Sequence, residues 1–247
     1  MAEPDYPDGS PHVIGRAAAT QVWRDVTMLH WRIDPAQLQA LLPAGLEPDL
    51  FDGSAWASLV PFEMVDLTLP PLPAIPRLTT FPETNIRTYV RGGRGPAVWF
   101  HSLDVTRAWM PPAARTLFGV PYTWSRMRIL RRGPAGEGQE LRYWCRRRWP
   151  RPVGATSLVG VRVGPPAAPD DLDRFLVNRW AAYSMVRGVL HHAPVVHDPW
   201  PLHEASTTVV HDELGAAAGL PLGDVERVRF APSATAVVFD WARPLPD

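Results

Sequence analysis

The sequence contains no lysine, because all 25 of its basic residues are arginine. An enzyme that forms a Schiff base with a carbonyl substrate uses the side-chain amine of a lysine as its nucleophile. This chain has no such amine, so Schiff-base chemistry carried by its own side chains is excluded.

Cysteine and long apolar runs are also scarce. Cys145 is the single cysteine, which excludes an intramolecular disulfide and any cysteine pair for zinc or redox exchange. Nowhere do eighteen apolar residues follow one another, and the acidic, proline-rich residues 1–11 do not have the pattern of a signal peptide. We therefore expect a cytoplasmic protein that neither inserts into a membrane nor is secreted.

A net charge of one sign is missing as well. The 25 arginines are balanced by 25 acidic residues, so no global field attracts nucleic acid or an anionic membrane. The one dense basic run, at 146–148, lies in a segment with strand character, and alternation would direct its arginines to opposite faces. We expect a solvated strand edge there, and a small molecule rather than nucleic acid or a membrane as the partner.

The chain has 46% hydrophobic and 20% charged residues, an ordinary balance for a globular protein, and 247 residues suit one large domain. We expect a flexible tail over residues 1–16 and a single domain over 17–247. Asp34 and Pro35 predict the start of a short helix. The longest predicted helix covers 171–187, with apolar residues on one face, Asp170 as its N-cap and Gly188 at its end.

Most of the remaining chain has strand character. Alternating β-branched and aromatic residues bounded by glycine and proline predict strands over 21–33, 55–69, 81–91, 97–106, 122–131, 140–149, near 195, and over 204–210, 225–230 and 236–241. Glycines at 92–95 predict an antiparallel hairpin. Many strands and few helices, without regular alternation, predict an α+β fold that is mainly antiparallel β, a barrel or sandwich with a few flanking helices.

The strand at 81–90 carries the most informative polar pattern. Alternation places Glu83, Asn85, Arg87 and Tyr89 on one face. Such a face most often meets water. If it instead faces inward, Glu83 and Arg87 lie about 13–14 Å apart along the strand and would bracket a small ligand. The arginine would bind a carboxylate, and the glutamate would have a raised pKa suited to acid or base catalysis.

Two other clusters have simpler explanations. His101, Ser102 and Asp104 suggest a hydrolase triad, but Ser102 and Asp104 share a strand face with the histidine opposite, and no Gly-x-Ser-x-Gly turn surrounds the serine. A second cluster contains His191, His192, His197 and His203. Its spacing matches no zinc motif, and loops broken by proline rarely preorganise three ligands. We expect structural histidines, and neither a metal nor a cofactor.

Several segments together resemble a known family. They are 30–32, 41–62, 81–90, 100–104, 117–127, 197–202 and the predicted helix around 175–179, and they span most of the chain. They resemble the YqjF-like family of uncharacterised bacterial proteins, which is similar to the acetoacetate decarboxylase superfamily. The resemblance implies an acetoacetate decarboxylase-like β-barrel that encloses a small, largely apolar pocket.

The resemblance also implies site residues. The decarboxylases have a glutamate on a pocket strand, which Glu83 resembles, and a Gly-Phe-Pro-Lys-Lys stretch whose lysine forms the Schiff base. The similar stretch here is residues 119–123, with Tyr122 and Thr123 at the two lysine positions. Acetoacetate decarboxylation by the usual route is therefore excluded. Non-covalent chemistry remains, with Glu83 and Tyr122 as catalytic residues and Asn85, Arg87, Thr123 and Trp124 as substrate-binding residues.

Three functions compete at this point. The first is a small-molecule enzyme that acts on a keto or carboxylate metabolite by non-covalent acid/base chemistry. The second is a non-catalytic small-molecule-binding protein that uses the same barrel pocket, since a fold does not determine a function. The third is a scaffold protein, suggested only by the eleven tryptophans and the proline-rich loop at 69–76. Unpaired sheet edges also allow a homo-oligomer.

Overall fold

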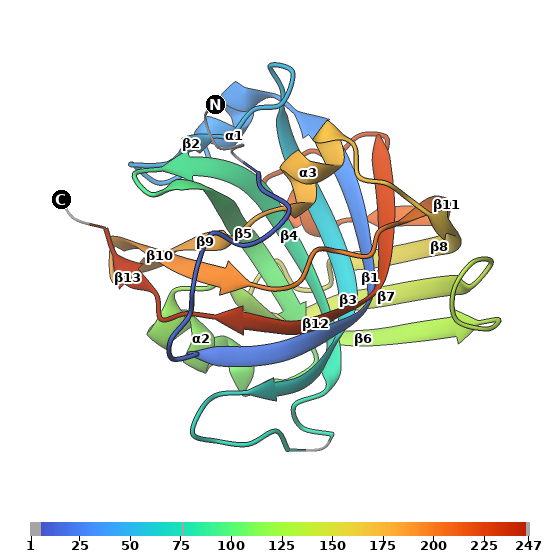
Figure 1. Ribbon diagram of the computed structural model, residues 1–247, viewed down its shortest axis with the longest axis horizontal. Coiled ribbons are helices and arrows are strands. Elements are labelled where there is room, and N and C mark those ends of the chain that lie inside the picture. Colours follow the sequence, from blue (N-terminus) through green and yellow to red (C-terminus); the bar gives the residue numbers. More distant parts are fainter. Residues whose placement is uncertain (1–5, 76, 246–247) are drawn as a thin grey trace.

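The computed structural model describes residues 6–75 and 77–245 and contains thirteen strands and four helices in them (Figure 1). The helices are α1 (Pro35–Gln39), α2 (Met110–Phe118), α3 (Asp171–Val177) and α4 (Leu214–Ala217). The strands are β1 (Ala19–Ile33), β2 (Glu47–Pro48), β3 (Ala55–Thr68), β4 (Phe81–Gly92), β5 (Gly95–Val105), β6 (Tyr122–Arg132), β7 (Glu140–Trp149), β8 (Thr156–Pro166), β9 (Ala181–Val186), β10 (Val189–Val196), β11 (His203–Asp212), β12 (Arg227–Phe239) and β13 (Arg243–Pro244). The expectation of a mostly-sheet α+β protein is confirmed.

The strands form one sheet that closes on itself. Neighbours follow the order β5-β6-β7-β8-β11-β12-β1-β3-β4, and β4 pairs again with β5. The hairpin of β9 and β10 makes a second closure, because β9 pairs with β5 and β10 with β12. Every pairing is antiparallel except those of β5 with β6 and with β9. Strands β12, β1, β3, β4 and β5 thus belong to both closed rings.

Because the shared strands have a ring on each side, both faces of β1, β3 and β4 are buried along most of their length. In β1, Met28 packs in one hydrophobic cluster and its neighbour Leu29 in another, and both are fully buried. In β4, Tyr89 belongs to the first cluster and Ile86 to the second. Successive side chains of a strand point to opposite faces, so the two clusters fill the two sides of the same sheet. A polar face on β4 therefore cannot meet water.

The predicted helix over 171–187 is wrong in its second half. Helix α3 ends at Val177, and residues 181–186 form strand β9. Arg187 and Gly188 both have positive φ and make a two-residue turn into β10, so the glycine that predicted a helix end belongs to a hairpin. Pairing with β10 and β5 prevailed over the helical spacing of the apolar residues.

Other expectations on local structure met with mixed results. The strand at 21–33, the hairpin of β4 and β5, and the N-cap of α1 by Asp34 are confirmed. Strand β8 was not predicted, and the two strands predicted over 225–230 and 236–241 are one long strand, β12. Across the described part of the chain, no helix has the length and apolar character needed to cross a membrane.

The flexible tail predicted over residues 1–16 is packed at Tyr6, while residues 1–5 lie outside the described residues. The Tyr6 hydroxyl donates to both oxygens of Asp49, at 2.8 and 3.0 Å, and its ring meets that of Phe175 edge-on. The Pro7 carbonyl accepts a hydrogen bond from the indole of Trp180. This segment therefore fastens the N-terminal part of the chain to α3 and the loop that follows it.

Candidate functional site

The polar face of β4 is buried. The exposed fractions are 2% for Glu83, 1% for Asn85, 6% for Arg87 and 0% for Tyr89. Strand β4 lies between β3 and β5, and the second ring covers this face with aromatic side chains. The sequence left open whether this face meets water or points inward, and in the structure it points inward.

Glu83 is a carboxyl group in an apolar setting. Burial raises its pKa to about 8, and the neighbouring Asn85 and Tyr122 side chains oppose the shift only in part. The Tyr122 hydroxyl lies 3.5 Å from Oε2 of Glu83, as a weak donor. Burial and the nearby carboxylate raise the pKa of Tyr122 well above its usual value. At neutral pH both groups are therefore mostly protonated and able to donate.

Tyr122 reaches Glu83 because of strand pairing. In the parallel pair of β5 and β6, Tyr122 is opposite Leu103, and Leu103 is opposite Asn85 on β4. In the adjacent row, Trp124 is opposite Val105, which is opposite Glu83. Tyr122 and Trp124 thus share a sheet face with Glu83 and Asn85.

Thr123 does not belong to this set. It points to the other face of β6, is buried there, and its hydroxyl lies 3.5 Å from the Leu103 carbonyl. Because adjacent residues of a strand diverge, Thr123 lies on the opposite sheet face from Glu83, and its substrate-binding role stays a prediction.

Arg87 is buried without an acidic partner. Among the described residues its side chain makes no hydrogen bond or ion pair, and its Nε atom is fully enclosed. Its guanidinium lies 6.0 Å from the centre of the Tyr89 ring. Buried charges are normally paired, so an arginine in this state is suited to hold an anion that enters from outside.

Asn85 also keeps unused hydrogen-bonding capacity. It lies close enough to Glu83 to affect its pKa, yet neither atom of its amide has a partner at hydrogen-bonding geometry. A buried amide with four unused hydrogen bonds is costly. Together with Arg87 it marks the place where a polar ligand would restore lost interactions.

Sequence reasoning missed a chain of hydrogen bonds beside Arg87. Nδ1 of His30 lies 2.6 Å from the Ser58 hydroxyl, which lies 2.6 Å from the Tyr89 hydroxyl. His30 pairs with Ser58 across β1 and β3, and Ser58 with Arg87 across β3 and β4. Burial, followed by the positive charge of Arg87, lowers the pKa of His30 well below its usual value. The three polar residues come from separate strands, so only the register could have revealed them.

The serine and aspartate of the rejected triad have another role. Arg147 donates to both carboxylate oxygens of Asp104, at 3.0 and 2.7 Å, and to the Ser102 hydroxyl at 3.0 Å. All three are buried on the face opposite Glu83. The prediction of a solvated edge at 146–148 is therefore wrong for Arg147. The alternation of β7 directs this side chain inward, while Arg146 and Arg148 are exposed.

The histidines of the C-terminal half are dispersed. His197 packs between Trp180 and Trp200, while Nδ1 of His203 lies 3.0 Å from the Gly164 carbonyl oxygen. His192 packs on Tyr183. Within residues 6–75 and 77–245, no three histidine, cysteine or acidic side chains gather as metal ligands.

Comparison with solved structures shows which fold this is. An acetoacetate decarboxylase-like enzyme from Sphingomonas wittichii RW1 superposes with a TM-score of 0.67 and 20% identity, covering 96% of this chain and 97% of that one. The enduracididine biosynthesis enzyme MppR, complexed with the condensation product of pyruvate and imidazole 4-carboxaldehyde, gives 0.67 and 16%, covering 93% and 90%. Acetoacetate decarboxylase from Legionella pneumophila gives 0.63 and 12%, covering 100% and 93%. The chain has the acetoacetate decarboxylase-like fold.

Sequence comparison defines the family. The uncharacterized protein YqjF of Bacillus subtilis (strain 168) is 33% identical over 203 residues, which are 82% of each chain. Residues 20–239 match the family DUF2071, described as an uncharacterized conserved protein. The expected YqjF-like resemblance is confirmed, and the chain belongs to the DUF2071 family.

Proposed function

We propose that this protein is an enzyme that acts on a small keto or carboxylate metabolite by non-covalent acid/base chemistry. The observation that carries the proposal is Glu83, a buried carboxyl with a pKa of about 8 that shares a sheet face with Tyr122 and Arg87. A carboxyl that holds its proton at neutral pH can act as a general acid, and titration close to the working pH is what such catalysis requires.

The residues divide the work by their chemistry. Arg87 binds the substrate carboxylate through its guanidinium, which has no competing acid among the described residues. Tyr122 donates a hydrogen bond to the substrate carbonyl oxygen and stabilises negative charge that develops there. Glu83 delivers its proton to that oxygen or to the adjacent carbon. Asn85, between Glu83 and Arg87 along β4, orients the ligand inside the closed ring of strands.

The comparisons support the substrate class. MppR binds a condensation product derived from pyruvate, and other proteins of similar fold are named acetoacetate decarboxylases, so keto acids recur among them. This chain lacks lysine and has Tyr122 and Thr123 in the stretch that resembles the lysine-bearing segment. That composition supports a hydrogen-bonding mechanism in place of a lysine imine.

The test is turnover of pyruvate and acetoacetate, as probes, by wild type and by Glu83→Gln. We expect the substitution to abolish turnover while calorimetric binding of the probe persists, since the amide keeps the shape but cannot transfer a proton. Wild-type activity should fall as pH rises through about 8, where the Glu83 proton is lost. Glu204→Gln, an exposed site, is the matched control. Unchanged turnover in Glu83→Gln would refute the catalytic role.

A non-catalytic binding protein is the second candidate, favoured by the lack of any lysine nucleophile together with the unpaired Arg87. It predicts that Arg87→Met loses affinity for the carboxylate probe while wild type returns the probe unchanged after long incubation. Mass spectrometry of the incubated probe separates the two candidates, because only an enzyme yields a product.

A further inference from the structure

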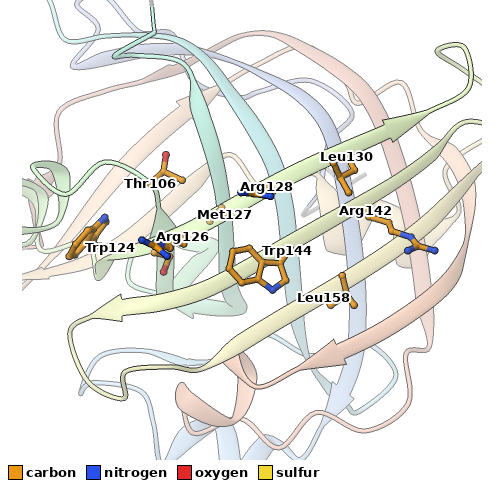
Figure 2. A pocket seen from close by; sticks show the side chains of 10 residues that line it. Thr106, Trp124, Arg126, Met127, Arg128, Leu130, Arg142, Trp144 and Leu158 are labelled. Atoms are coloured by element: carbon orange, nitrogen blue, oxygen red, sulfur yellow. The ribbon is translucent and has the colours of Figure 1, made fainter.

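An open groove of about 760 Å³ lies on the solvent face of β6, β7 and β8. Figure 2 shows Trp124 and Arg126 at one end, Leu130 and Arg142 at the other, and Trp144 between them. Alternation explains the set, because every second residue of β6 and β7 points outward while the intervening residues fill the core. The outward residues are mostly arginine and tryptophan.

The arginines along the groove have no acidic partners among the described residues, whereas Arg162, further along the same face of β8, forms an ion pair with Glu140 at 2.6 Å. Arg126 is directly opposite Arg146 in the pairing of β6 with β7, and like charges in that position repel. Within the described residues, neither of them nor Arg128 or Arg142 forms an ion pair, although many other arginines of this neutral chain do. The positive charge of the groove is therefore left for an anion.

The groove also offers flat apolar surfaces. Trp144 has Arg128 opposite on one side and Leu158 on the other, and it is only partly exposed. Trp124 lies under the guanidinium of Arg148, 5.8 Å from its ring centre. An indole face between cationic groups is suited to stack a ring whose substituents are anionic.

One end of the groove adjoins the buried site. Trp124, Val105 and Glu83 are opposite one another on β6, β5 and β4, so Trp124 and Glu83 share a face two strand spacings apart, about 10 Å. Thr106 also lines this end, and its hydroxyl oxygen is buried without a hydrogen-bond partner. The groove therefore begins on the same face of the sheet as the buried Glu83.

We infer that this groove binds a phosphorylated, ring-bearing handle, such as a nucleoside diphosphate, on a substrate whose keto or carboxylate end enters at Glu83. The inference rests on the proposed function for the position of the reacting end. The arginines bind the phosphates, Trp144 stacks the ring, and Thr106 takes a polar group at the junction. The groove volume lies within the usual range for small-molecule sites.

Other anionic partners fit less well. A bilayer takes up protruding apolar side chains, whereas Trp124 and Trp144 line a hollow. A second copy of the chain placed face to face would bring two sets of unpaired arginines together. A ring-bearing phosphate satisfies both the charge and the indole faces.

The first experiment is calorimetric titration with ADP, pyrophosphate and adenosine at low salt. We expect ADP to bind more tightly than either part alone. Arg126→Ala should weaken ADP binding about tenfold, because a charged hydrogen bond is lost. Arg16→Ala removes the same charge from an exposed site, where the side chain forms no ion pair with the described residues, and should leave ADP binding unchanged. Absence of ADP binding, or equal weakening by both substitutions, would overturn the inference.

The second experiment tests continuity with the buried site, using acetoacetyl-coenzyme A as a probe that joins a keto acyl group to a phosphorylated adenosine. Tyr122→Phe should weaken binding of this probe and leave ADP binding intact. If both ligands bind Tyr122→Phe as they bind wild type, the groove is separate from the site and the inference fails. Failure of the proposed function is seen independently, as turnover that survives in Glu83→Gln.

Discussion

At the scale of single residues, Glu83 couples the site to the stability of the fold. Its pKa rises from 4.5 to about 8 on folding, chiefly through burial. Between these values the unfolded chain releases a proton that the folded protein keeps. Stability therefore falls as pH rises through this window, by up to about 1.4 kcal/mol per pH unit, and levels off above pH 8.

Glu83→Gln should remove this dependence. The amide does not ionise, so the free energy of unfolding of the variant relative to wild type should increase from pH 5 to pH 8. Urea denaturation at both pH values checks the prediction. A difference that does not vary with pH would show that Glu83 titrates near its ordinary value.

Two buried arginines provide a matched comparison. Arg147 is held by Asp104, whereas Arg87 has no acidic partner among the described residues. Arg147→Met should lower the free energy of unfolding by about 3–5 kcal/mol, because it leaves the buried Asp104 carboxylate without its partner. Arg87→Met removes an uncompensated charge and should leave the ligand-free protein at least as stable as wild type. Urea denaturation of both variants measures this, and equal losses would make Arg87 a structural residue.

At the scale of elements, Gly119 sets the approach of β6 to the site. It ends α2 with a φ of +64°, three residues before Tyr122, and a Cβ there would overlap the carbonyl oxygen of Met185 in β9. Its conformation and this contact both require glycine. The start of β6, and with it the hydroxyl that reaches Glu83, depends on that close approach.

Gly119→Ala should therefore lower the free energy of unfolding by about 3 kcal/mol or more, because backbone strain and overpacking add together. Gly133→Ala is its control, since Gly133 has a φ of +80° but its Cβ would meet no atom closer than 3.9 Å. We expect the free energy of unfolding of Gly133→Ala to fall by about 1–2 kcal/mol, from backbone strain alone. Thermal or urea unfolding compares the two, and equal losses would show that the contact with β9 is unimportant.

At the scale of the whole molecule, the N-terminal segment joins distant parts of the chain. Tyr6 contacts Asp49, which also binds Arg91 and Arg179, and the Arg179 guanidinium lies 4.5 Å from the Tyr6 ring centre. These residues come from the loop after β2, from β4 and from the loop after α3. A residue early in the chain thus completes a buried charge cluster.

Tyr6→Ala should lower the free energy of unfolding by about 2 kcal/mol, because ring contacts and the hydrogen bond of the hydroxyl to a buried carboxylate are lost. Val13→Ala, at a side chain that is 97% exposed, should change it by less than about 0.5 kcal/mol. Urea denaturation at neutral pH tests both. Equal effects would mean that the segment is not fastened at Tyr6.

The sequence alone determined what depends on near neighbours. Alternation placed Glu83, Asn85 and Arg87 on one face of a strand, the glycines at 92–95 predicted the hairpin, and the lack of lysine excluded an imine. Each of these rests on two-residue periodicity, on turn chemistry or on composition, which require no knowledge of distant residues.

Only the tertiary structure decided what depends on pairing between distant strands. It buried the polar face of β4 under a second ring, brought His30 and Ser58 beside Tyr89, and turned Arg147 inward to Asp104. It also made residues 181–186 a strand, although their apolar spacing is that of a helix. Register and ring closure arise from contacts far apart in sequence, and local pattern cannot encode them because each strand alone fits several partners.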